Sequence, residues 1–128
     1  MKQSLANRSK FLAIIIMALL SFPLAAKAVD PPYQKEMQRL TLIFGSLYFL
    51  QPLCGFEKTD WRTQASELIE LDRPDDDRKQ RLMGAFNQGY NSYKKTYNSC
   101  TSSANQARWR LLNEAYEATN EIRTRFAE

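Results

Sequence analysis

Four segments of the chain carry hydrophobic residues three or four positions apart, the spacing of an α-helix. The first segment should start near Tyr33, after two prolines, and end at Pro52 and Gly55. It is apolar nearly all the way round, and a helix of that kind usually lies at the centre of its bundle. Its most regular hydrophobic positions are Met37, Leu40, Phe44 and Leu47.

The second segment is short and should form a helix capped by Asp60, because aspartate accepts hydrogen bonds from the free N–H groups of a first turn. A turn begins at Asp72, and we expect this aspartate to cap the next helix, with Pro74 in its first turn. The inner face of the second helix is expected to consist of Trp61, Ala65, Leu68 and Leu71.

The third segment continues from this turn to Cys100 and carries three tyrosines along its hydrophobic face. Gly84 and Gly89 interrupt it, and glycine within a helix often marks close packing against a neighbour. The hydrophobic face consists of Leu82, Phe86, Tyr90, Tyr93, Tyr97 and Cys100.

The fourth segment should begin at Ser103, which together with Gln106 matches the capping-box pattern. Glu121 and Arg125 stand four residues apart and can form an ion pair on its outer side. The residues expected to face inward are Leu111, Ala115, Ile122 and Phe126.

Four helices with short connections predict an all-α, four-helix up-down bundle. The chain has two cysteines, and in such a bundle the end of the first helix, at Cys54, and the end of the third, at Cys100, lie at the same pole. A disulfide closing that loop would stabilise the fold by about 4 kcal/mol. A redox pair is disfavoured, because the chain has no C-x-x-C motif and no His beside either cysteine.

The N-terminus has the pattern of a secretory signal. Basic residues precede an apolar core over residues 11–20, Pro23 breaks the helix, and Ala26-Lys27-Ala28 has the small-x-small pattern of a cleavage site. We therefore expect residues 1–28 to be a cleaved signal peptide and residues 29–128 to form a single helical domain. The alternative is an uncleaved membrane anchor, and the core is short for a membrane span. Membrane contact is otherwise expected only before cleavage.

The net charge of +4 comes entirely from this N-terminal segment. Lys2, Arg8, Lys10 and Lys27 account for four of the 18 basic residues, so the remaining chain carries 14 basic and 14 acidic residues. Without a basic surplus the domain has no electrostatic signature of nucleic-acid binding.

Several motifs together resemble a small uncharacterised family of exported alphaproteobacterial proteins that have a signal sequence and two well-separated cysteines. The resemblance covers roughly residues 40–104. It implies a Gram-negative periplasmic location and supports the disulfide, and it implies no activity. The motifs are Leu50-Gln51-Pro52-Leu53-Cys54-Gly55, Trp61-Arg62, Ala85-Phe86-Asn87-Gln88-Gly89-Tyr90, Tyr97 and Cys100.

The third segment offers the clearest candidate binding face, made of Tyr90, Tyr93 and Tyr97 beside Asn87 and Asn91. Tyrosine rings stack on sugars and amides bond to them, which in the periplasm favours peptidoglycan as a ligand. Aromatic residues at helical spacing are more often part of the core edge, with packed rings and wet hydroxyls.

Two dipeptides, Trp61-Arg62 and Trp109-Arg110, place a large ring beside a cation, as interface hot spots do. Each Trp is more often a core residue. The acidic run of Asp72 and residues 75–77 lacks the ligand spacing of a calcium loop, and capping and dipole roles account for it, so no metal site is expected.

Catalytic chemistry is poorly supported by this composition. The chain has no His, which removes the usual general base and the commonest zinc ligand, and no cofactor motif is present. We therefore expect a non-catalytic binding or accessory module that contacts another envelope protein. The alternative is a module that binds a glycan or small ligand through the Tyr/Asn face.

Overall fold

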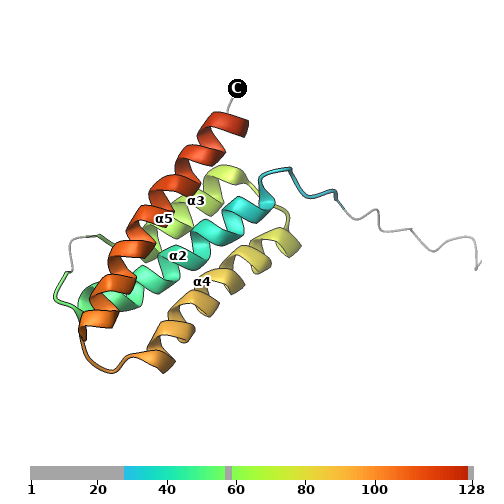
Figure 1. The fold of residues 1–128 in the computed structure, drawn as a ribbon. Helices are drawn as coiled ribbons and strands as arrows, with labels where there is room; N and C mark the ends of the chain where they lie inside the picture. The colour runs from blue at the N-terminus through green and yellow to red at the C-terminus, as the bar shows by residue number, and fades with distance from the viewer. Residues whose placement is uncertain (1–27, 57–58, 127–128) are drawn as a thin grey trace, which may run out of the picture.

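The computed structural model describes residues 28–56 and 59–126, and within them the chain forms four helices and no strands (Figure 1). Apart from Ala28, the expected signal segment lies outside the described residues. The helices are α2 (Gln34–Leu53), α3 (Trp61–Asp72), α4 (Asp76–Thr96) and α5 (Ser102–Phe126). None of these helices is long and apolar enough to cross a membrane.

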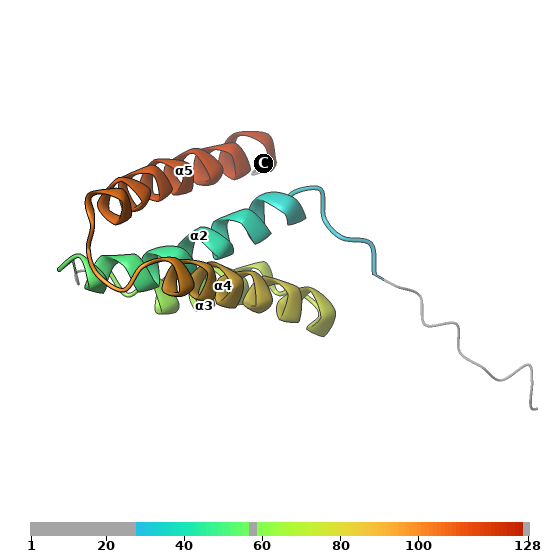
Figure 2. The ribbon, with the colours of Figure 1, turned by 60° about the horizontal axis from the view of Figure 1, so that its bottom comes forward.

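Consecutive helices run in opposite directions, which confirms the up-down bundle (Figure 1). The helix α2 is central, because α3, α4 and α5 all pack against it. Figure 2 shows α5 on one side of α2, with α3 and α4 on the other. Among the described helices, α2 is the only one whose backbone lies close to that of α5.

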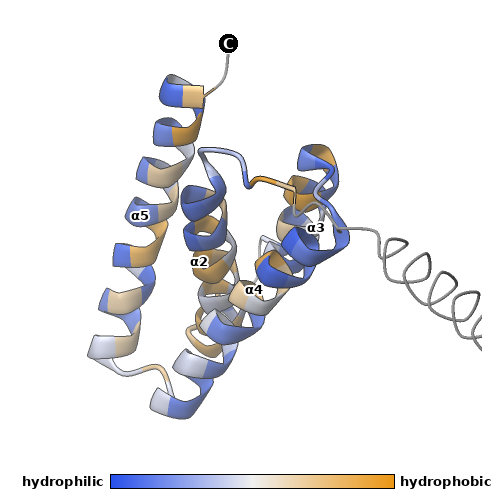
Figure 3. Cartoon of the chain, turned by 90° about the vertical axis from the view of Figure 1, so that its right-hand side faces the viewer, coloured by the Kyte–Doolittle hydropathy of each residue, from blue (hydrophilic) through white to orange (hydrophobic). Residues whose placement is uncertain are grey.

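The larger core lies between α2 and α5 and matches large residues with small ones. Leu47 and Leu50 of α2 are fully buried against alanines of α5. Hydrophobic residues recur on the side of α5 that faces α2 (Figure 3). Since the alanines add little bulk, the two helices can pack closely. The buried members of this core are Leu40, Ile43, Leu47, Leu50, Ala104, Ala107, Leu111, Ala115 and Ala118.

On the other side of α2, glycines allow α2 and α4 to cross at close range. A Cβ atom added to Gly89 would overlap the carbonyl oxygen of Leu42, and one added to Gly45 would overlap that of Phe86. The expected close packing at Gly89 is therefore confirmed, whereas a Cβ at Gly84 would meet nothing within 4 Å. Nearer the N-terminal ends of α2 and α4, a smaller core is formed by Met37, Ile69 and Leu82, which come from three helices.

Two of the predicted caps are wrong. Asp75, not Asp72, caps α4, and its carboxylate accepts a hydrogen bond from the N–H of Arg78 at 2.8 Å. Thr101, not Ser103, caps α5, since its hydroxyl accepts from the N–H of Ala104 at 3.1 Å. In both cases the chain offers neighbouring residues of equal capping ability, and tertiary packing decides where the helix begins.

The inner face of α3 differs from the prediction at two positions, because Ile69 is buried in place of Leu71. Ala65 and Ile69 are buried, but Leu71 is 81% exposed. Leu71 follows Ala65 by six residues, about 1.7 turns of an α-helix, so it emerges on another side. The predicted cap is confirmed, because the Asp60 carboxylate accepts from the N–H groups of Arg62 and Thr63 at 3.1 Å.

The predicted disulfide is confirmed. Cys54 follows α2 and Cys100 precedes α5, and their Cα atoms lie 4.9 Å apart. The bond joins the end of α2 to the connection between α4 and α5. We call this end of the bundle the disulfide pole.

Candidate functional site

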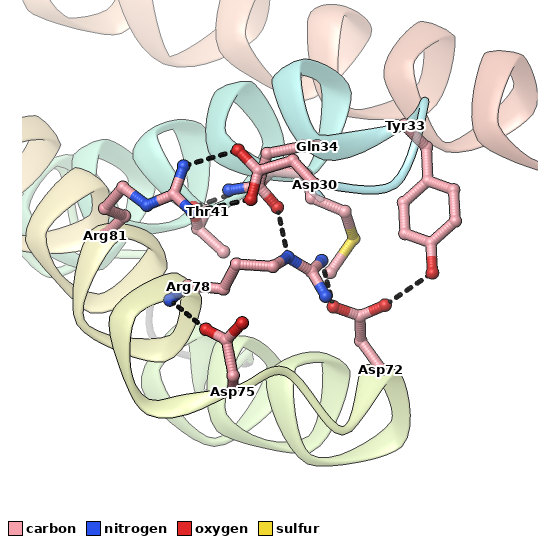
Figure 4. A network of polar contacts seen from close by, with 9 residues as sticks. Asp30, Tyr33, Gln34, Thr41, Asp72, Asp75, Arg78 and Arg81 are labelled. Atoms are coloured by element: carbon pink, nitrogen blue, oxygen red, sulfur yellow. Dashed lines mark hydrogen bonds and ion pairs between the residues drawn. The ribbon is translucent and has the colours of Figure 1, made fainter. Parts of the chain in front are cut away.

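A buried polar network closes the opposite end of the bundle (Figure 4). The guanidinium of Arg78 in α4 donates to the carboxylate of Asp72 at 2.5 Å and to the amide oxygen of Gln34 at 2.8 Å. The hydroxyl of Tyr33 donates to the second carboxylate oxygen of Asp72 at 2.8 Å. Three elements are thus joined through one arginine, which gives the network an architectural role.

A second arginine ties the segment before α2 to the same pole. Arg81 donates two hydrogen bonds of 2.6 Å to the carboxylate of Asp30 (Figure 4). This hydrogen bonding lowers the pKa of Asp30 from its usual value. Because both side chains are partly exposed, solvent weakens the pair, and its effect is mainly to direct the chain into α2.

Tyr90 and Tyr93 of α4, and Tyr97 directly after it, lie at the edge of the core, half-buried, as the core-edge interpretation expects. The helix ends at Thr96, before the predicted end at Cys100. Tyr90 packs edge-on against Phe49, with 5.7 Å between ring centroids, and against Tyr48 at 5.9 Å. Tyr93 and Tyr97 stack on each other with their planes 16° apart. One side of each ring is therefore used by the fold.

Two of the tyrosine hydroxyls contact α5. Tyr97 shares a hydrogen bond of 3.0 Å with Ser103, and Tyr93 accepts one of 3.4 Å from Arg110. Hydrogen bonding to Tyr93 raises the pKa of Arg110. These contacts join α4 to α5 beside the disulfide pole through side chains alone.

The two asparagines of the predicted binding face, Asn87 and Asn91, are both exposed, but they have different surroundings. Asn91 lies on the outer side of α4, one position after Tyr90. Asn87 lines a hollow between α3 and α4 together with Arg62, which was predicted from a different motif. The fold thus brings these two predicted residues together.

Trp61 packs inward, as the core interpretation of its motif expects. Its indole N–H donates to the side-chain oxygen of Gln51 at 2.6 Å, and its ring lies 5.1 Å from that of Phe44. The ring is half-buried, and one edge of it borders a shallow surface depression beside Tyr48 and Phe56.

Trp109, by contrast, is 56% exposed, and Tyr116 one heptad further along α5 is 71% exposed. The cation beside Trp109 is Arg108 and not the Arg110 of the sequence motif. The buried guanidinium of Arg108 lies 4.5 Å from the Trp109 ring and 3.8 Å from the Phe56 ring. Sequence spacing placed Trp109 in a candidate motif but gave no signal for this stacking, which depends on the loop after α2.

No group of three or more His, Cys, Asp or Glu side chains in residues 28–56 and 59–126 is placed to hold a metal ion. The two buried arginines, Arg78 and Arg108, are both engaged by neighbouring side chains.

No curated protein and no solved structure matches the chain in the comparisons made. A family model described as "Protein of unknown function (DUF2385)" matches residues 32–126. This range includes all four helices and both cysteines. The chain therefore belongs to the DUF2385 family.

Proposed function

We propose that the protein is a non-catalytic binding module that contacts another protein of the cell envelope through the outer face of α5. We define this face by Trp109, Asn113 and Tyr116, which follow one another at helical spacing and are all exposed. The observation that carries the proposal is the exposed but fixed indole of Trp109.

The ring of Trp109 is held in place before any partner arrives. Arg108 lies against it, and Arg108 is in turn held by the Phe56 ring and by two hydrogen bonds to Asn105 of 3.1 and 3.2 Å. Ordering a side chain on binding costs free energy, so a ring that is already ordered contributes more to affinity. Trp, Tyr and Arg are the residues that most often dominate protein interfaces.

The fold leaves this face available. The residues of α5 that pack against α2 are mainly alanines, and Trp109 and Tyr116 are exposed on another side of the helix. Trp109 and Tyr116 lie seven residues apart on the same side of α5, and exposed apolar side chains that gather on one face and are rimmed by polar ones are typical of interaction sites.

Export to the periplasm of a Gram-negative cell is part of the proposal. It is supported by the signal-like pattern of residues 1–28 and by the disulfide, since an oxidising compartment permits such a bond. Alphaproteobacterial origin is likewise proposed from the sequence resemblance.

Chemical cross-linking in intact cells, followed by mass spectrometry of the cross-linked products, tests the proposal. We expect a heterologous product containing this chain and an envelope protein. Recovery of the monomer alone, under conditions that cross-link known envelope complexes, would overturn it.

A second proposal is that the Tyr/Asn face of α4 binds glycan. Its support is the stacked pair of Tyr93 and Tyr97, whose rings are half-exposed. Asn91 is exposed too, but it lies on another side of α4, so the aromatic pair carries this proposal. Co-sedimentation with purified peptidoglycan tests it, and protein that stays in the supernatant would contradict it.

A further inference from the structure

A small hollow is lined by residues of α3 and α4. These two helices lie on the side of α2 away from α5 (Figure 2). The two helices that border it approach each other over only a short stretch, and α2 holds them both. Its volume is about 60 Å³. At 10–15 Å³ for each water-sized group, this space admits roughly four to six non-hydrogen atoms.

The hollow is apolar below and polar above. Its deepest lining residues are Ala65 and Ile69, which are buried, and Phe86, which is half-buried. Its rim carries the exposed side chains of Arg62, Ser66 and Asn87 and, beside them, the exposed Met83. An apolar floor under a few convergent polar groups is the usual composition of a small-molecule site.

The hydrogen-bonding capacity of this rim is unused within the described part of the chain. Most arginines there donate to a neighbouring side chain, including Arg39, Arg110 and Arg125. The guanidinium of Arg62, however, has no partner among the described residues, and neither has the Ser66 hydroxyl or the Asn87 amide. Three side chains with donors therefore surround one opening, and no carboxylate lines it.

We propose that this hollow binds an aliphatic carboxylate, with Arg62 pairing with the carboxylate and a short hydrocarbon group entering between α3 and α4. A guanidinium forms two parallel hydrogen bonds with a carboxylate, and a hydroxyl and an amide can donate to its remaining lone pairs. The hydrocarbon group is limited to a few carbon atoms by the volume. Such a ligand is either a free short-chain acid or the C-terminus of a peptide that ends in a small apolar residue.

This site is separate from the outer face of α5, so it goes beyond the proposed protein contact. Loss of Trp109 should leave it intact, and loss of Arg62 should leave the α5 contact intact. The two proposals can therefore fail independently.

Nuclear magnetic resonance titration of the oxidised protein tests the site with four probes. Isobutyrate and a peptide ending in valine are compared with isobutyramide and the same peptide amidated at its C-terminus. We expect the two acids to shift the side-chain signals of Arg62, Asn87 and Met83 saturably, and the two amides to bind at least tenfold more weakly. Stronger binding of the peptide acid than of isobutyrate identifies a chain terminus as the ligand, and the reverse identifies a free acid.

Arg62→Gln should weaken acid binding at least tenfold, whereas Arg73→Gln should not change it. Arg73 is a matched control because it is also exposed, follows the same helix and has no partner among the described residues. Both variants should have the melting temperature of the wild type, since neither arginine side chain pairs with another described side chain that supports the fold. Equal binding of acid and amide, or acid binding that survives Arg62→Gln, would overturn the proposal.

Discussion

The guanidinium of Arg78 and the carboxylate of Asp72 lie 2.5 Å apart, and their side chains are only 9% and 7% exposed. Asp72 ends α3 and Arg78 stands in the first turn of α4, so their pairing fixes the reversal between the two helices. The hydroxyl of Tyr33 completes the coordination of Asp72 from the start of α2. The pole opposite the disulfide is thus closed by charge and hydrogen bonds instead of a covalent bond.

Arg78→Ala should lower the free energy of unfolding by about 3–5 kcal/mol, because it leaves the Asp72 carboxylate buried without a counter-charge. Denaturant unfolding of the oxidised protein measures this. Arg81→Ala is the control, since it breaks the partly exposed pair with Asp30, and its effect should be much smaller. Equal losses from the two variants would show that burial does not distinguish the pairs.

Alkaline pH should weaken the same pole through Tyr33. Its hydrogen bond to Asp72 raises the pKa of Tyr33 in the folded protein. The stability that this proton contributes is complete below the unfolded pKa of about 10 and is lost as the pH rises through the folded value. Wild type should therefore exceed Tyr33→Phe in unfolding free energy at pH 8, and the difference should shrink above pH 10. A difference that stays constant to pH 11 would contradict this account.

The crossing of α2 and α4 predicts opposite results for two alanine substitutions. Gly89→Ala would place a methyl group on the Leu42 carbonyl, so the helices must separate, and we expect a loss of about 1–3 kcal/mol or more. Gly84→Ala has open space and should stabilise α4 by about 0.5–1 kcal/mol. Thermal unfolding compares them. If Gly89→Ala melts no lower than Gly84→Ala, the close approach is wrong.

The disulfide pole predicts non-additive losses. Cys54→Ser and Cys100→Ser should each remove about 4 kcal/mol, and the double variant should lose no more than either single one. Denaturant unfolding under non-reducing conditions gives the three values. Losses that add in the double variant would mean that each cysteine stabilises the fold separately.

Much of the fold was predictable because it depends on local patterns. The hydrophobic period located all four helices, and the proline and glycine positions set the bounds of α2. The apolar circumference of α2 predicted its central place, and alternating helix direction predicted that Cys54 and Cys100 would meet. Each of these inferences needed only residues close together in the chain or the count of helices.

The remaining features depend on partners far apart in the sequence. Asp72 was expected to cap α4, but its carboxylate accepts hydrogen bonds from Arg78 and Tyr33 instead. Only the folded arrangement brings these residues near one another. Gly45 gave no local signal of its own, because its role is set by the Phe86 backbone. The same holds for the candidate surfaces, where Arg62 meets Asn87 only when α3 lies beside α4.

Photo-cross-linking from α5 in living cells tests the central claim most directly. The residue p-benzoyl-phenylalanine replaces Tyr116 on the outer face of α5 or, as a control, the exposed Gln80 of α4. We predict a discrete protein adduct from position 116 that Trp109→Ala abolishes without changing the melting temperature, and none from position 80. Adducts of equal yield at 80 and 116, no adduct at 116, or one that persists in Trp109→Ala would contradict the claim that this face binds an envelope protein.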